Sequence, residues 1–467
     1  MFVFIIVILI LITFTACSKT DTKNVKQYEE IEQCCDNTTE TANVAYVEEE
    51  TENAIPNVES EILQEQVETI PLDAQDTPTV VEDFTPTEVK QAEQENLDRY
   101  TLKQGMSYYD GEMDMSYITS ITFARESPIE YDEKWFANIT DTDDIVGYRV
   151  GTEVFIVGDK IYFNESCGMM FCVKSADGDP VLDSLTEVNG LDIIDTSKVK
   201  RMSYMFCGGE NFKHLDVGKW DVSNVENMKM MFAGCTNLEF IDVSNWDVSN
   251  VSNFTAMFQG SDHAGDMKLK EIDVSKWNTN SATKMGHMFY GCGALETIAV
   301  DSWNVSNVTT FTHMFADCFP LKSLNILNWD TTSVESFNAF LNDCRNLETI
   351  DISGLETSTC KQFSQMFESC SNLTKIIGIE TMDVSNASYY AFSEMFHGCT
   401  ELESLDLSKW DTSKADNMAR MFAGCSGLKE LDLSSFDLSN VWTFEEMFEG
   451  CSEELEIVGD DINNEIR

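Results

Sequence analysis

The sequence predicts an α/β solenoid, in which short repeated coils stack along one axis. Three observations predict it: a Met-Phe pair recurs about every 26 residues, each copy holds one strand-like and one helix-like apolar pattern, and a single copy is too small to bury its own apolar face. Two intervals, of 31 and 29 residues, contain short insertions. The anchoring positions are Phe206, Phe232, Phe258, Phe289, Phe315, Leu341, Phe367, Phe396, Phe422 and Phe448.

The helix-like part of one coil lies between Trp220 and Gly234. Ser223 and Glu226 have the spacing of a capping box at a helix N-terminus, and Gly234 suits the left-handed residue that ends a helix. The apolar residues between them recur at helical spacing, which predicts a short helix with one inward face. These residues are Val225, Met228, Met231 and Phe232.

A strand-like pattern follows in each coil. Leu238, Ile241 and Val243 have the L-x-x-L-x-L spacing of the strand in a leucine-rich repeat. We therefore expect a leucine-rich-repeat-like solenoid with a parallel β-sheet on one face and short helices on the other.

A β-rich segment precedes the repeats and is expected to cap the apolar end of the solenoid. We place this cap at 106–190, together with a degenerate first repeat at Met170-Phe171. The solenoid is placed at 191–458 and a C-terminal tail at 459–467. Short β-branched or aromatic runs in the cap predict a small β-meander; they cover residues 117–123, 145–150, 153–157 and 160–163.

The first 105 residues have the composition of an export signal and a tether. Residues 1–16 form an apolar run shorter than the roughly 20 residues of a membrane-spanning helix, which favours a signal peptide. Phe14-Thr15-Ala16-Cys17 resembles a lipoprotein cleavage site, so Cys17 is the predicted lipidation residue; a short uncleaved anchor and an ordinary secretory signal are the alternatives. Residues 17–105, acidic and interrupted by proline, predict a disordered tether, and the vicinal pair Cys34-Cys35 has no assigned role.

Charge restricts the possible partners. The chain has 467 residues, 82 of them acidic and 30 basic, for a formal net charge of −52. Such a chain repels phosphate, which excludes nucleic acid as a partner and leaves the N-terminal lipid as the expected contact with a membrane. We expect a monomer on the cell surface, anchored by this lipid, or a secreted protein as the alternative.

The recurring string W-D-[VT]-S-N-V-x-x-M-x-x-M-F-x-G-C-x-x-L-x-x-[IL]-D-[LV]-S resembles the repeat of BspA-like leucine-rich repeat surface proteins. The segment before the repeats, VGYRVGTEVFIVGDKIYFNESCGMMF, resembles the lead-in of such arrays, and the likeness covers about 300 of 467 residues. The resemblance implies a bacterial surface protein, and members with an assigned function are adhesins that bind host matrix proteins or other microbes.

One column of acidic residues is the predicted ligand-binding site. These residues lie between the two inward aliphatic residues of each strand, so that the two-residue alternation of a strand points them outward, onto the concave face that leucine-rich repeats use for ligands. The alternative is that they are solvated, or bond neighbouring serines and backbone groups. The column consists of Asp216, Asp242, Asp273, Asp351, Asp406 and Asp432, and Ala299 and Asn325 interrupt it.

Three further columns are interpreted as structural. The Trp column is expected to be core and not a sugar platform, and the Cys column lacks the paired spacing of a zinc site, although isolated cross-coil disulfides are permitted in an exported protein. A second Asp series suits turns and helix N-termini. The columns are Trp220, Trp246, Trp277, Trp303, Trp329 and Trp410; Cys235, Cys292, Cys318, Cys344, Cys370, Cys399, Cys425 and Cys451; and Asp221, Asp247, Asp330, Asp383, Asp411 and Asp437.

The sequence predicts binding and not catalysis. It has no HExxH motif, phosphate loop or nucleophile elbow, and we predict no catalytic residue, metal or cofactor. The leading hypothesis is a surface lipoprotein whose concave face binds a protein or glycan, and the alternative is a structural or antigenically variable coat protein with no defined ligand. Variation two residues before the acidic column favours binding; these positions read His214, Phe240, Glu271, Thr297, Ser323, Thr349, Ser404 and Glu430.

Overall fold

The structure is a computed structural model, and it describes residues 94, 98–103, 115–140, 142–174, 182–260 and 267–459. The predicted signal peptide, the lipidation residue Cys17, the pair Cys34-Cys35 and most of the tether lie outside these residues, as does the tail beyond Gly459. Within the described part of the chain, no helix combines the length and apolar character that a bilayer crossing requires.

A five-stranded sheet precedes the solenoid. Its order is β2-β3-β4-β1-β5, and the strands are β1 (Ser120–Ala124), β2 (Glu133–Phe136), β3 (Val146–Val150), β4 (Glu153–Val157) and β5 (Glu187–Asn189). β2, β3 and β4 pair antiparallel, as in a meander, but β1 pairs parallel with both β4 and β5. The meander prediction was therefore wrong for β1, because a parallel neighbour cannot be reached through a hairpin.

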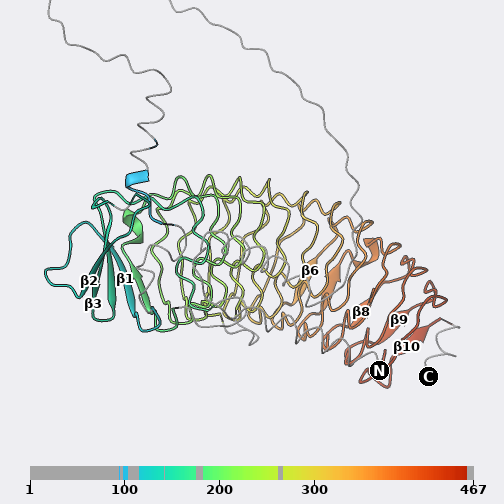
Figure 1. Ribbon diagram of the computed structural model, residues 1–467. Coiled ribbons are helices and arrows are strands. Elements are labelled where there is room, and N and C mark those ends of the chain that lie inside the picture. The colour runs from blue at the N-terminus through green and yellow to red at the C-terminus, as the bar shows by residue number, and fades with distance from the viewer. Residues whose placement is uncertain are drawn as a thin grey trace, which may run out of the picture. The chain divides into compact units, whose positions relative to one another are not determined.

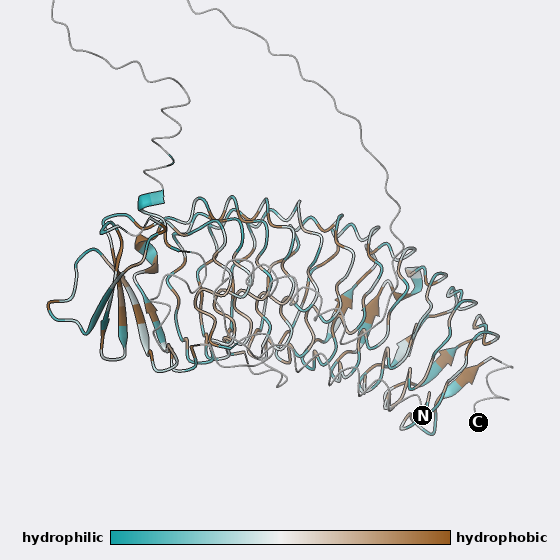
Figure 2. Cartoon of the chain, viewed as in Figure 1, coloured by the Kyte–Doolittle hydropathy of each residue, from teal (hydrophilic) through white to brown (hydrophobic). Residues whose placement is uncertain are grey.

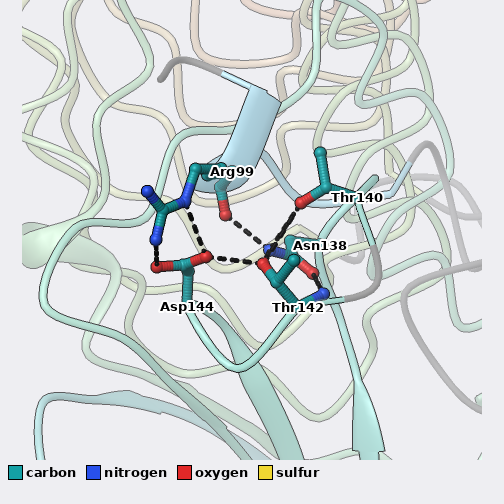
Figure 3. Close-up of polar contacts among 5 residues, drawn as sticks. All are labelled: Arg99, Asn138, Thr140, Thr142 and Asp144. Atoms are coloured by element: carbon teal, nitrogen blue, oxygen red, sulfur yellow. Dashed lines mark hydrogen bonds and ion pairs between the residues drawn. The ribbon is translucent and has the colours of Figure 1, made fainter. Parts of the chain in front are cut away.

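A polar cluster ties the start of the described chain to this sheet (Figure 3). The guanidinium of Arg99 donates two hydrogen bonds to the carboxylate of Asp144, at 3.0 and 2.9 Å. The fully buried amide of Asn138 donates to the carbonyl of Arg99 and to the hydroxyls of Thr140 and Thr142. Because each member bonds another member, we interpret the cluster as structural: it holds the segment around Arg99 against the loop that carries Asn138 and Asp144.

The remaining coils form a parallel β-solenoid of about 11 turns (Figure 1). Regular strands occur only toward its C-terminal end among the described residues, where β6 pairs with β7 and β9 pairs with β8 and β10, all in parallel. Their bounds are β6 (Thr349–Asp351), β7 (Lys375–Ile377), β8 (Ser404–Leu405), β9 (Glu430–Asp432) and β10 (Glu456–Val458). Two 3-10 turns, η2 (Leu191–Ile193) and η3 (Ile379–Thr381), each precede a coil.

The predicted short helices are absent from the described residues of the repeats, and this part of the fold prediction was wrong. In the segment predicted as a helix, Met228, Met230 and Phe232 donate their backbone N–H groups to carbonyls of the next coil, each at 2.9 Å. Met231 and Ala233, which alternate with them, donate to the carbonyl three residues earlier, at 3.2 Å. The segment is thus a chain of turns joined to its neighbours by a ladder, and equivalent bonds link the other coils.

A left-handed residue in every coil makes this arrangement possible. An α-helix needs negative φ throughout, whereas φ in this column lies between 50° and 59°. Such a conformation costs an L-residue about 1–2 kcal/mol, and the cross-coil hydrogen bonds on either side offset that cost. The column consists of Tyr204, Met230, Ala256, His287, His313, Ala339, Gln365, Glu394, Arg420 and Glu446.

The predicted capping box also has a different role. The Ser223 hydroxyl donates to the carboxylate of Asp221, and the backbone N–H of Glu226 donates to the carbonyl of Lys200 in the preceding coil. Gly234 is left-handed as predicted, with φ of 72°, but it ends a turn and not a helix.

The core runs the length of the solenoid, and Figure 2 shows hydrophobic and hydrophilic stretches alternating along each coil. The anchoring phenylalanines stack directly on one another: Phe171 lies 5.2 Å from Phe206, and Phe206 lies 5.5 Å from Phe232, measured between ring centroids. Met170-Phe171 therefore belongs to the stack. Such stacking adds about 0.5–1.5 kcal/mol per pair beyond the buried area.

Candidate functional site

The structure places the six aspartates of the predicted site outside the core, each between two inward residues. Asp216, Asp242, Asp273 and Asp406 are exposed, and Asp351 and Asp432 are half-buried. The two-residue alternation on which the prediction rested therefore holds in these segments, although only those of Asp351 and Asp432 are regular strand residues.

Most of these carboxylates already have hydrogen-bond partners within their own coil. In Asp242, Asp273, Asp351 and Asp406, Oδ1 accepts bonds from the backbone N–H and the hydroxyl of the serine two residues later. Asp432 accepts the backbone N–H of Ser434, and Gly218 replaces the serine after Asp216. The hydroxyl, followed by the N–H, lowers the pKa of Asp273 and Asp406. This geometry agrees with the alternative interpretation, in which the aspartates bond neighbouring serines and backbone groups and so fix turns.

The second Asp series has the same geometry. Oδ1 of Asp221, Asp247, Asp330 and Asp411 accepts the backbone N–H of the residue two positions later, at 3.0 to 3.2 Å. Asp383 and Asp437 do the same. These residues therefore hold turns, as predicted, but no helix follows them.

The Trp column is buried, as interpreted from the sequence. Each indole N–H donates to a backbone carbonyl of the preceding coil; the bond from Trp329 to Val300 is 3.0 Å and that from Trp246 to Val217 is 3.1 Å. All six rings are at most 4% exposed, so no face is open to a sugar.

The Cys column is buried except at Cys451, which is half-buried. Each thiol lies 3.0 to 3.3 Å from the backbone carbonyl of the anchoring residue in the preceding coil, as Cys344 does at Phe315 and Cys370 at Leu341. A cysteine therefore supplies both small apolar volume and a weak donor. All twelve cysteines that the structure describes are free, and burial raises the pKa of Cys370 to about 12. No group of three or more His, Cys, Asp and Glu residues in the described chain could hold a metal.

The left-handed column carries titratable residues in the middle coils. The rings of His287 and His313 stack with centroids 4.8 Å apart. Burial, with a smaller contribution from His313, lowers the pKa of His287 to about 4. Both rings are therefore neutral at pH 7 and serve as packing groups.

An acidic pair lies further along the same face. Asp317 is only 7% exposed, and burial together with the nearby Asp343 raises its pKa to about 6. Asp343 in turn binds Arg345 through two hydrogen bonds of 2.6 Å. Sequence reasoning missed this pair, although Asp317 and Asp343 stand where most coils have glycine.

Sequence reasoning also missed an exposed aromatic group, which we call the aromatic corner: Tyr389, Tyr390 and Trp442. Their side chains are 41%, 48% and 64% exposed. Tyr390 lies 5.2 Å from Tyr389 and 6.1 Å from Trp442, and both pairs are nearly perpendicular, at 87° and 86°. The available signal was the 29-residue interval between Phe367 and Phe396, which contains both tyrosines.

Comparison with known families now identifies the repeats. Residues 180–268, 261–378 and 374–457 match the family described as "Mycoplasma protein of unknown function, DUF285", and together they cover more than half of the chain. The chain belongs to the DUF285 family. Each DUF285 match spans about three to four coils, so that the three matches together cover the cross-coil ladder and the Trp and Cys columns.

Other comparisons add little to the DUF285 assignment. No curated protein matches the chain. Among solved structures, a chain from the crystal structure of a TLR13–ssRNA13 complex matches with 12% identity and a TM-score of 0.15. The match covers 64% of this chain and spans 62% of the length of that chain.

Proposed function

We propose that this DUF285 protein is a BspA-like surface lipoprotein whose solenoid binds a protein or glycan, as an adhesin does. The observation that carries the proposal is a contrast between columns. The inward Trp and Cys columns are nearly constant and fully used in packing, whereas outward positions such as His214, Phe240 and Glu271 change from coil to coil. A constant frame with variable outward residues suits recognition, because the frame fixes where each variable side chain lies.

The second candidate is a coat protein with no defined ligand. The turn bonds of the Asp column favour it, because they explain the recurrence of those aspartates without any partner. Variation of the outward residues would then reflect antigenic change and not recognition. Catalysis is not part of either proposal.

The proposed location is the cell surface, with lipid on Cys17 as the anchor. Acyl chains contribute about 0.8 kcal/mol per buried CH₂, which holds a protein at a membrane and leaves the repeats in water. Metabolic labelling with a radioactive fatty acid tests this: wild-type protein is labelled and Cys17→Ala is not. Label retained by the variant would contradict the proposed anchor.

Binding is tested with the full chain on a panel of purified extracellular-matrix proteins and glycans, at low and high salt. Asparagine replaces all six residues of the ligand-binding prediction in one variant, namely Asp216, Asp242, Asp273, Asp351, Asp406 and Asp432. The matched control carries the same change in charge at Asp221, Asp247, Asp330, Asp383, Asp411 and Asp437. Saturable binding supports the proposal, and loss in the first variant alone assigns it to that column. Binding to no member of the panel favours the coat protein.

A further inference from the structure

We propose that the aromatic corner is a recognition site for the cationic side chain, lysine or arginine, of a protein partner. The inference deepens the proposed function, because it names a partner class and a place for it on the solenoid. It rests on the exposure of the three rings, on their angles and on the charge around them.

The fold places the corner outward through an insertion. Two residues are inserted ahead of Ala391, and Tyr389 and Tyr390 both adopt left-handed backbone conformations there, with φ of 61° and 58°. The insertion is held at its two ends: Ser388 N–H donates to the carbonyl of Lys361, and Ala391 N–H donates to the carboxylate of Asp416. Left-handed residues recur in every coil, but among the described residues only Tyr389 and Tyr390 adopt this conformation consecutively.

Trp442 completes the corner from another coil. Its backbone N–H donates to the carbonyl of Asp416, so that Asp416 lies between the tryptophan and the inserted tyrosines. Trp442 is the one exposed tryptophan of the eight in the chain, since the other seven are at most 8% exposed. Equivalent positions in earlier coils carry small or polar residues, among them Ser252 and Thr283. A ring of this size exposed at such a position has no packing role that the neighbouring coils require.

The ring angles favour a cation over a sugar. Sugars stack on one broad flat surface, but here each ring meets its neighbour at nearly 90°. The rings meet edge to face and so form no flat platform, while the 64% exposed indole of Trp442 offers a negative π-face that attracts a cation. Ammonium and guanidinium groups bind aromatic faces within about 6 Å of the ring centroid, and tryptophan binds them most strongly.

The charge near the corner and in the chain segment that carries Trp442 has the sign that a cation needs, since the carboxylate of Asp416 accepts the N–H of Ala391, next to Tyr390. From residue 430 to residue 459 the chain has nine acidic residues and no lysine or arginine: Glu430, Asp432, Asp437, Glu445, Glu446, Glu449, Glu453, Glu454 and Glu456. Two of the nearby cations, Lys361 and Arg420, are already paired with carboxylates. Lys361 pairs with Glu335 at 2.9 Å, and Lys414 donates to Asn386 at 2.5 Å. Arg420 lies 3.6 Å from Glu394 and 3.7 Å from Glu446.

The test is a titration of the full chain with octalysine at 150 mM salt, followed by 5-fluorotryptophan NMR and calorimetry. The net charge of −52 attracts octalysine everywhere, so a local readout is needed. We expect the resonance of Trp442 to shift and those of the seven buried tryptophans to stay. Trp442→Leu keeps apolar bulk but removes the π-face, and should weaken the fitted Kd about fivefold.

The matched control is Phe136→Leu. Phe136 is 42% exposed in β2, outside the repeats, and its replacement by leucine should leave the Kd unchanged. A glycine-serine octapeptide should not shift Trp442. The inference is overturned if Trp442→Leu binds octalysine like the wild type, or if maltoheptaose or chitohexaose shifts Trp442 and octalysine does not.

The panel experiment separates this inference from the proposed function. If the wild type binds a panel member and Trp442→Leu binds it equally well, the aromatic corner is not the recognition site and the proposed function stands. If the wild type binds no panel member, the proposed function fails, while the octalysine titration still decides whether the corner holds a cation.

Discussion

The Trp column inside the solenoid and the Asp column on its surface recur with the same period, and both make hydrogen bonds, but the bonds run in different directions. Each indole N–H reaches a carbonyl of the preceding coil, as Trp329 does at Val300. Five of the six aspartates bond to a serine within their own coil, as Asp273 does to Ser275. The first kind of bond joins neighbouring coils, and the second only shapes one turn.

This difference teaches which repeated residues set the stability of the array. In a solenoid, stability is the sum of the coils and the interfaces between them. Residues that bond across the interface act on both coils, whereas residues that bond locally act on one. Mutations can break or sharpen this comparison.

The largest effect is expected for Trp329→Ala. The ring is 1% exposed and packs against Phe311 at 4.9 Å, so its removal leaves a cavity and takes one of two hydrogen bonds from the Val300 carbonyl, which keeps the bond from the Trp303 N–H. We expect the free energy of unfolding to fall by about 3–5 kcal/mol in chemical denaturation. The matched control, Trp442→Ala at an exposed tryptophan, should change it by less than about 0.5 kcal/mol. Equal losses in the two variants would contradict the comparison.

A smaller effect is expected for Cys344→Ala. The substitution removes a fully buried sulfur and the thiol that bonds the Phe315 carbonyl. A loss of about 1–2 kcal/mol is expected in the same assay. Cys344→Ser keeps a hydrogen-bond donor at this position and so tests how much the bond contributes. If the serine variant were no more stable than the alanine variant, packing alone would explain the Cys column.

Asp317→Asn tests the comparison at an aspartate of another kind. Unlike the Asp column, Asp317 is buried, and no hydrogen bond to a residue two positions later explains its place. Its pKa, near 6 in the folded protein, lies above the ordinary value, so the folded state favours the protonated form. Protonated Asp317 contributes fully to stability below about pH 4, and this contribution is lost as the pH rises through about 6. The variant should therefore be about 1 kcal/mol more stable than the wild type at pH 8, with no advantage at pH 4, in thermal melts.

The matched control for Asp317 is Asp330→Asn. The hydrogen bond from the Thr332 hydroxyl, with a smaller contribution from its N–H, lowers the pKa of Asp330. Its contribution is present at neutral pH and is lost as the pH falls through the lowered value, so this variant should be less stable than the wild type at pH 8. The same sign in both variants would contradict the assignment.

The smallest effect is expected for Asp273→Asn. Asparagine can still accept the Ser275 bonds, and the carboxylate is exposed, so the loss should be a few tenths of a kcal/mol at pH 7. A loss above about 2 kcal/mol would mean that the Asp column, like the Trp column, joins neighbouring coils.

The repeat and its core could be predicted from the sequence because both are local in the chain. Phe206, Phe232 and Trp246 recur at one period, and stacking brings equivalent residues together. The helix could not be distinguished from the ladder, because bonded turns of three residues place Val225, Met228 and Met231 inward just as a helix does. A helix and the ladder differ in which carbonyl accepts each backbone N–H, and in the ladder that carbonyl lies in another coil.

Prediction of the site was incomplete for a similar reason. The outward position of Asp273 follows from alternation, but its bond to Ser275 depends on how the chain turns after the strand-like segment. The aromatic corner joins Tyr390 to Trp442 across 52 residues and an intervening coil. No pattern within one repeat contains that contact.

The cysteine column gives each coil that carries it a chemical reporter. A thiol bonded to a carbonyl inside the stack reacts with an alkylating reagent only when its coil opens. A brief exposure to such a reagent, followed by peptide mass spectrometry, would therefore read opening coil by coil at Cys235, Cys292, Cys318, Cys344, Cys370, Cys399, Cys425 and Cys451. The order of labelling would show from which end the solenoid comes apart, with the half-buried Cys451 as the starting point of the scale.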